Sequence, residues 1–107
     1  MREVTLIRKK TFVASLGKVM VYIQSSQVYD LFLEGVRCKR VGLLKNGQLI
    51  NFEIPDSETI LFVVFDQLLP ERFHSKYIIP SGKQNIILYT KPKLKPREGN
   101  PFVITDH

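Results

Sequence analysis

The sequence holds few of the residues that mark a catalytic, metal-binding or disulfide-bonded protein. It has one cysteine, Cys38, two histidines and no tryptophan in 107 residues. A single cysteine cannot close an intramolecular disulfide, so nothing points to passage through an oxidising compartment. His74 and His107 are far apart, and neither has the spacing from Cys38 that zinc ligands usually show. We therefore expect no metal site and no cofactor.

The common catalytic sequence patterns are also missing. The chain has no nucleophile-elbow pattern, no dinucleotide-binding glycine pattern and no phosphate-binding loop. Cys38 lies between Arg37 and Lys39, and neighbouring cations favour a thiolate. Consecutive strand residues point to opposite faces, however, so a cysteine packed as a small apolar side chain is the preferred interpretation. We predict a protein that is not an enzyme and has no small-molecule substrate.

No apolar run approaches the roughly 20 residues of a membrane span. The N-terminus also lacks the apolar core and the cleavage site of a signal peptide. The default expectation is a cytoplasmic protein, although a signal or anchor carried by a longer parent chain would lie outside this sequence. A composition of 44% hydrophobic and 24% charged residues is typical of one globular domain.

Residues 41–66 contain three apolar runs, separated by Asn46-Gly47 and by a turn at residues 55–57. Asn-Gly suits the positive φ angles of a type I′ turn, so we predict a hairpin that places Arg40 opposite Glu53. Strict alternation assigns four residues of this hairpin to its inward face: Val41, Leu43, Ile50 and Phe52. The third run, residues 60–65, is apolar on both faces and is predicted to be the most buried strand.

The other strands are predicted from shorter patterns. Residues 4–9 are expected to form an edge strand, because lysines at a sheet edge discourage pairing with another molecule. Val19, Val21 and Ile23 define the buried face of a second strand. Residues 28–34 form another short run, with a short helix as the alternative.

Two further segments complete the expected body of the domain. Residues 67–73 are predicted to be a single helical turn or an irregular crossover. A second hairpin is expected between residues 76–79 and 85–90, joined by the turn sequence at residues 80–83.

These patterns together predict an all-β protein of seven to nine short strands with at most one helical turn. The expected architecture is a two-layer antiparallel β-sandwich over residues 1–90, either immunoglobulin-like or prealbumin-like. Residues 91–107 form a segment rich in proline and lysine, which is expected to be extended. Phe102, Val103 and Ile104 are predicted to dock back on the domain as a short terminal strand.

Residues 42–55, 60–63, 79–82 and 86–88 follow a rhythm of Asn-Gly turn, Ile-Pro strand end, apolar strand and Ile-Pro-x-Gly turn. This rhythm resembles that of small prealbumin-like or carboxypeptidase-regulatory-like β-sandwich domains, including the PEGA-type repeats. The resemblance covers roughly residues 18–90. It implies a sandwich fold, an accessory or interaction role and no catalytic residues.

The chain is basic, with a formal net charge of +6 and a pI near 9.6. Its densest basic groups lie at residues 8–10, 37–40 and 91–97, and most of these side chains are expected to be ordinary solvated surface. One group is singled out as a possible basic interaction surface: Lys91, Lys93, Lys95 and Arg97.

The function predicted from the sequence is that of a non-enzymatic accessory or protein-interaction module. Its binding surface would be the basic C-terminal segment, an exposed edge strand that accepts another strand, or an edge used for self-association. The alternative is a basic single-stranded nucleic-acid-binding domain, because aromatic rings among lysines on a β-face can stack on bases.

Overall fold

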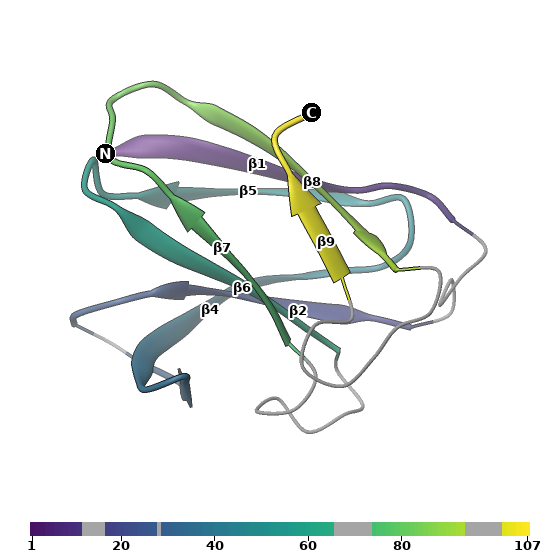
Figure 1. The fold of residues 1–107 in the computed structure, drawn as a ribbon, viewed down its shortest axis with the longest axis horizontal. Helices are drawn as coiled ribbons and strands as arrows, with labels where there is room; N and C mark the ends of the chain where they lie inside the picture. Colours follow the sequence, from purple (N-terminus) through teal and green to yellow (C-terminus); the bar gives the residue numbers. More distant parts are fainter. Residues whose placement is uncertain (12–16, 28, 66–73, 94–101) are drawn as a thin grey trace.

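The computed structural model describes residues 1–11, 17–27, 29–65, 74–93 and 102–107, which form nine strands and no helix (Figure 1). We refer to the four-stranded layer as sheet A. Its strands, in spatial order, are β5 (Leu49–Ile54), β1 (Arg2–Arg8), β8 (Ile86–Pro92) and β9 (Phe102–Thr105). The five-stranded layer is sheet B. Its strands, in spatial order, are β3 (Leu31–Leu33), β4 (Val36–Leu44), β2 (Val19–Gln24), β6 (Thr59–Phe65) and β7 (His74–Ile79). The predicted all-β, two-layer architecture is confirmed.

The main core lies between the inner faces of the two sheets. Sheet A contributes Val4, Leu6, Phe52 and Leu88 among others, and sheet B contributes the predicted face Val19, Val21 and Ile23. Strand β6 is buried on both faces, as its unbroken apolar run predicts: Leu61 and Val63 point into the main core. Phe62 and Val64 point the other way and enter a second cluster with Leu33 and Cys38.

The position of β1 differs from the expectation. It was predicted as an edge strand, but it lies inside sheet A between β5 and β8. Its pairing with β8 is parallel, which is the exception to the antiparallel pattern among the described strands. The basic residues that suggested an edge follow the strand or turn inward instead, so they do not protect an edge.

The hairpin predicted around Asn46-Gly47 is not formed. β4 belongs to sheet B and β5 to sheet A, so this turn carries the chain from one layer to the other and Arg40 does not face Glu53. Gly47 has a φ of 81° but Asn46 does not have a positive φ. A type I′ turn needs positive φ at both central residues, so the turn lacks the twist that a tight hairpin requires.

The second predicted hairpin is wrong for a related reason. β7 pairs with β6 in sheet B, whereas β8 pairs with β1 and β9 in sheet A. The turn at residues 80–83 therefore also crosses between the layers. Its Gly82 N–H donates to the Asp56 carbonyl at 2.8 Å, which ties it to the neighbouring crossing at residues 55–58.

The inward face predicted for residues 41–52 is partly right. Val41, Ile50 and Phe52 pack on the main core, although from two different sheets. Leu43 does not belong to that core, and Leu44 is fully buried in its place. The cause is a register shift in the β2–β4 pairing between Val21 and Tyr22, which adds one residue to β4 and reverses its alternation.

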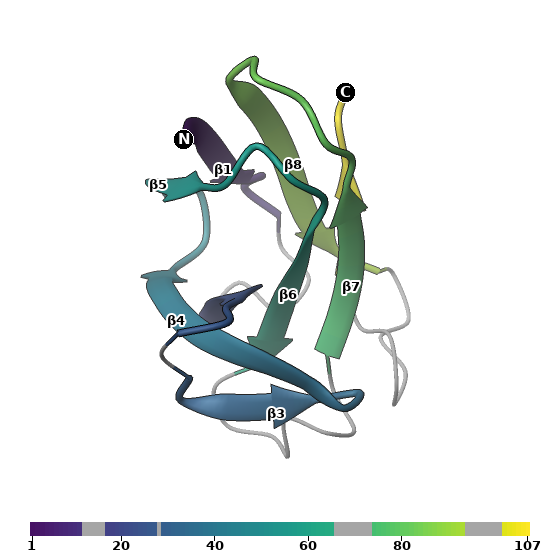
Figure 2. The same cartoon turned by 90° about the vertical axis from the view of Figure 1, so that its left-hand side faces the viewer.

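A hairpin does form between β3 and β4, at Glu34-Gly35. Both residues have positive φ angles, 51° and 76°, as a type I′ turn requires. The short helix considered for residues 28–34 is therefore not present where β3 is described. Figure 2 shows that this hairpin crosses the outer side of sheet B beneath β6 and β7. Leu33 and Cys38 thereby pack on Phe62.

Two inward-pointing arginines lie at the two ends of β1 and close the ends of the sandwich. Arg2 is 4% exposed and donates to the carbonyls of Pro55, Ser57 and Pro80 at 2.6–3.2 Å. Arg8 is fully buried and donates to two other carbonyls. Both arginines thereby donate to backbone carbonyls at the ends of the sandwich, groups that are costly to bury without a donor.

The remaining segments lie near the C-terminus. β8 continues through Pro92, past the predicted domain boundary at residue 90, and β9 lies antiparallel to it with Phe102 buried. The helical turn or crossover predicted for residues 67–73 lies outside the described residues. In the part of the chain that the structure describes, no helix has the length and hydropathy needed to cross a bilayer.

Candidate interaction surfaces

The four residues of the predicted basic surface have different positions. Lys91 is exposed on β8, opposite Val103 of β9. Lys93 follows the end of β8 and is partly buried. Lys95 and Arg97 lie outside the described residues. Of the four, the structure describes Lys91 and Lys93.

The parallel pairing of β1 and β8 brings two separate basic groups of the sequence together. Arg8 is in register with Thr90, and the Lys9 N–H donates to the Thr90 carbonyl at 2.9 Å. The next residues, Lys9 and Lys91, therefore lie side by side. The Lys9 ammonium is 5.1 Å from the centre of the Tyr89 ring, which is within range of a cation–π interaction.

A network around Asn46 adds more lysines to the same end of the sandwich. The Asn46 side chain accepts from the Thr11 N–H and donates to the Thr11 carbonyl, both at 3.0 Å. These two hydrogen bonds hold Lys10 against the turn. A Cβ added to Gly47 would lie 3.7 Å from the Lys10 Cβ. We call this region the lysine end: Lys9, Lys10, Lys18, Lys45, Lys91 and Lys93. Its strand ends and turns at residues 9–11, 17–18, 45–48 and 91–93 contain no aspartate or glutamate.

The outer face of sheet A carries apolar side chains that no described element covers. Leu49 and Ile87 are each 54% exposed. Ile7 lies between Leu49 and Tyr89 in the strand register, and all three point outward. Single exposed apolar residues are ordinary, but neighbouring ones on a flat sheet form a patch that can bind a partner. Lys9 and Lys91 border this patch at the lysine end.

The opposite end of the molecule, marked by the N-terminus in Figure 1, is called the acidic end: it carries four carboxylates against three cationic groups, the N-terminal ammonium, Arg2 and Lys83. Four carboxylates lie there at strand ends and in the β5–β6 connection: Glu3, Glu53, Asp56 and Glu58. Glu3 and Glu53 face each other across β1 and β5. Like charges directly opposite one another in a sheet repel, so this pair weakens the β1–β5 contact.

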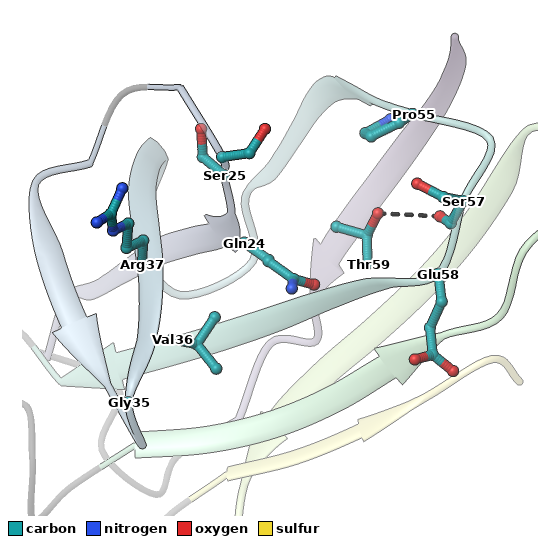
Figure 3. Close-up of a pocket in the computed structure, with 10 residues that line it drawn as sticks. Gln24, Ser25, Gly35, Val36, Arg37, Pro55, Ser57, Glu58 and Thr59 are labelled. Atoms are coloured by element: carbon teal, nitrogen blue, oxygen red, sulfur yellow. Dashed lines mark hydrogen bonds between the residues drawn. The ribbon is translucent and has the colours of Figure 1, made fainter.

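A hollow of about 500 Å³ opens at the start of β6 beside the β3–β4 hairpin (Figure 3). Two of its polar side chains bond to neighbouring backbone: Gln24 Oε1 accepts from the Ile60 N–H at 3.2 Å, and the Thr59 hydroxyl donates to the Ser57 carbonyl at 3.1 Å. Arg37 and Glu58 lie on opposite sides of the hollow and do not converge. A small-molecule site needs polar groups aimed at a common point, and these residues do not supply one.

Another surface lies on the exposed side of the β3–β4 hairpin. Tyr29 and Phe32 are about half exposed, and their rings contact edge to face with centroids 4.8 Å apart. The Arg37 guanidinium lies 5.3 Å from the centre of the Tyr29 ring. Two rings and a guanidinium at the surface are groups that can stack on nucleic-acid bases. The sequence shows these residues but not that the fold brings the two rings and Arg37 together.

Cys38 is buried as predicted and is not placed for nucleophilic chemistry. Its side chain is fully buried in the second cluster, and its thiol donates to the Val36 carbonyl at 3.4 Å. Burial raises the pKa of Cys38 to about 11. A thiol with such a pKa carries very little thiolate at neutral pH, and thiolate is the reactive form.

Glu34 links the turn of the hairpin to β7. Its carboxylate accepts from Lys76 Nζ at 2.9 Å and lies 2.8 Å from His74 Nε2. β3 and β7 are the two outer strands of sheet B, so these bonds hold the hairpin across the back of the sheet. The hydrogen bonds from Lys76 and His74 lower the pKa of the Glu34 carboxyl.

Acidification is expected to weaken this link. Because the pKa of folded Glu34 lies below its ordinary value of 4.5, the bonds stabilise the fold fully above that value. The contribution is lost as the pH falls through the lower folded pKa. Glu34 is 41% exposed, so solvent screens the bonds and we expect less than about 1 kcal/mol. Denaturant unfolding of Glu34→Gln and wild type should differ more near neutral pH than in acid. An equal difference at both would contradict the assignment, and Glu58→Gln is the matched control.

Among the described residues, no group of three or more histidine, cysteine, aspartate or glutamate side chains could hold a metal ion. No family model, no curated protein and no solved structure matches the chain. The resemblance to prealbumin-like domains therefore stays a prediction.

Proposed function

We propose that the protein is a non-enzymatic interaction module that binds an acidic protein partner across the outer face of sheet A. The observation that carries this proposal is the juxtaposition of exposed Leu49 and Ile87 with Lys9 and Lys91 on one face. Such a face suits a segment that has apolar residues next to carboxylates. The apolar contacts would supply affinity, and the lysines would steer and orient the partner.

Aliphatic side chains make this face better suited to protein than to nucleic acid. Tyr89 is the aromatic ring that accompanies Leu49, Ile7 and Ile87, and Lys9 already lies over it. Bases stack on rings and guanidinium planes, whereas Leu and Ile offer no such surface. We place this binding in the cytoplasm, where a free buried thiol such as that of Cys38 stays reduced.

A second candidate function, single-stranded nucleic-acid binding, has support on a different surface. Tyr29, Phe32 and Arg37 on the β3–β4 hairpin form the stacking cluster described above. The net charge of +6 would add an attraction to phosphate. The two candidates use different residues, so surface variants can separate them.

The test of the first candidate is selection of random peptides on the immobilised protein. Selected peptides should be rich in aspartate, glutamate and apolar residues. Changing both Lys9 and Lys91 to glutamate should weaken their binding about tenfold or more, because two attractive charges become repulsive. Lys83→Glu reverses an exposed charge at the acidic end and is the matched control. Peptides without acid enrichment, or equal binding to the double variant, would contradict the proposal.

Fluorescent oligo(dT) tests the second candidate. Tight binding that falls steeply with salt and is lost in Tyr29→Ala and Phe32→Ala would favour nucleic acid. Binding that depends on Lys9 and Lys91 but not on the two rings would be a general attraction of a basic protein for phosphate.

A further inference from the structure

Strand β5 is an edge strand of sheet A. It has six residues and pairs on one side with β1. The edge strand β3 has three residues and β9 has four. β7 contacts β9 at the side of the sandwich, where the Phe102 N–H donates to the Ser75 hydroxyl at 2.8 Å. β5 therefore offers a six-residue edge whose second side pairs with no described strand.

The hydrogen bonds between β1 and β5 show which backbone groups of β5 point away from β1. The Arg8 N–H donates to the Gln48 carbonyl at 2.8 Å, and Arg8 continues the β1 register opposite Gln48. In an antiparallel pair, bonded and non-bonded positions alternate. The backbone groups of Ile50, Phe52 and Ile54 therefore face β1. Those of three residues face the open edge: Leu49, Asn51 and Glu53.

The usual protections of an exposed edge are absent from this strand. Proteins block such edges with lysine, proline or a β-bulge. Leu49–Ile54 contains neither lysine nor proline, and its register with β1 has no shift. A regular, unprotected strand of this length is a template for a further strand.

We propose that two copies of this chain pair through β5, antiparallel and centred on Asn51. This centre places Leu49 opposite Glu53 of the other copy and uses the full length of the strand on both sides. Centring on Leu49 would bring the Lys45–Gln48 turn into the ladder, and centring on Glu53 would bring in Pro55, which has no N–H. The pairing joins the two A sheets into one continuous sheet.

Charge complementarity selects a second copy as the occupant of this edge. Antiparallel pairing reverses one molecule relative to the other, so the lysine end of each copy lies beside the acidic end of its mate. Lys45 and Lys10 then lie near Glu58 of the other copy, and near Asp56, which also pairs with the N-terminal ammonium of its own chain at 3.5 Å. Opposite charges brought within a Debye length, about 8–10 Å at ordinary ionic strength, attract one another.

The test is sedimentation of the whole chain over a range of concentrations and at two salt concentrations. The wild type should form dimers that dissociate at lower protein concentration when salt is raised. Asn51→Pro removes the central outward N–H and should shift the dissociation midpoint about tenfold or more toward monomer. Asn51→Ala loses the same amide side chain, and with it the 2.7 Å hydrogen bond from Thr5, but keeps the N–H, so it should still dimerise.

A second variant keeps the proposal testable if Asn51→Pro does not fold. Glu53→Lys removes the repulsion with Glu3 within the chain, so the monomer should be at least as stable as the wild type. It also places a positive charge beside the lysine end of the other copy, so dimerisation should weaken about tenfold. Glu3→Lys makes the same charge change one strand away from the edge and is the control. A wild type that stays monomeric at high concentration, or dimers unaffected by both edge variants, would overturn the proposal.

Failure of this proposal and failure of the proposed function are distinguishable. Asn51→Pro leaves Lys9 and Lys91 in place, so a monomeric variant should still bind the selected acidic peptides. The variant in which Lys9 and Lys91 are both changed to glutamate retains the β5 edge. Loss of peptide binding in that variant would therefore not bear on dimerisation, which Asn51→Pro tests separately.

Discussion

Replacing Phe62 with alanine is expected to lower the free energy of unfolding by about 3–5 kcal/mol. Phe62 is fully buried, and it lies on the face of β6 that points away from the main core. Its ring fills the space between β6 and the β3–β4 hairpin, beside Leu33 and Cys38. The His74 ring meets it edge to face at 5.7 Å. Alanine would leave a cavity that a hairpin fixed by its own hydrogen bonds cannot fully close.

Phe32→Ala is the matched control, because it removes the same side chain from the exposed side of the same hairpin. Phe32 is 47% exposed, so its loss should change the stability by less than about 0.5–1 kcal/mol. Denaturant unfolding of the two variants measures the difference. Hydrogen exchange adds a local readout, since the amides of β3 and of the first half of β4 should lose protection in Phe62→Ala before those of β1. Equal losses in the two variants would mean that the second cluster does not hold the hairpin.

The dual burial of β6 is a feature that the sequence predicts well. An apolar run at both odd and even positions has no solvent face, so residues 60–65 had to be covered on two sides. The sequence does not say what provides the second cover. Here it is the β3–β4 hairpin of the same sheet, bent over at the register shift near Val41. A shift of one residue leaves no mark in the composition of the strand.

The two turns that contain Gly47 and Gly35 show why strand pairing was harder to predict than strand position. Asn46-Gly47 has the preferred sequence of a type I′ turn, yet Asn46 does not have a positive φ because its side chain is held by Thr11. Glu34 has a far weaker preference for positive φ and nevertheless takes it, held by His74 and Lys76. In both turns, contacts distant in sequence override the local preference. Val41, Ile50 and Phe52 still pack on the main core, which is why a wrong hairpin still led to the right sandwich.

The candidate surfaces were predictable only in part, for a similar reason. The sequence shows the basic groups at residues 8–10 and 91–97, but not that β1 and β8 are parallel neighbours. That pairing joins strands from the two ends of the chain, and it places Lys9 beside Lys91. A local signal for one misjudged residue did exist: Arg8 shares the period-two face of Val4 and Leu6, so its side chain had to turn inward with them.

Arg8→Met is expected to lower the free energy of unfolding by about 3–5 kcal/mol, from the loss of buried hydrogen bonds and of a desolvated cation–π contact. Arg8 Nη1 donates to the Gly17 carbonyl at 2.7 Å and to the Leu44 carbonyl at 3.0 Å. Its guanidinium lies 5.5 Å from the centre of the Phe102 ring. Burial lowers the pKa of Arg8, but a guanidinium begins so far above neutrality that it stays charged.

Methionine tests the hydrogen bonds rather than the volume, because it keeps an apolar stem and removes the donors. Arg8→Lys should recover part of the stability, since an ammonium restores the charge without the planar fork that reaches several acceptors at once. Lys45→Met removes an exposed charge from the same end and should change the stability by less than about 0.5 kcal/mol. If Arg8→Met unfolds like the wild type in denaturant, the carbonyls of Gly17 and Leu44 have other donors. Arg8 would then not close this end of the sandwich.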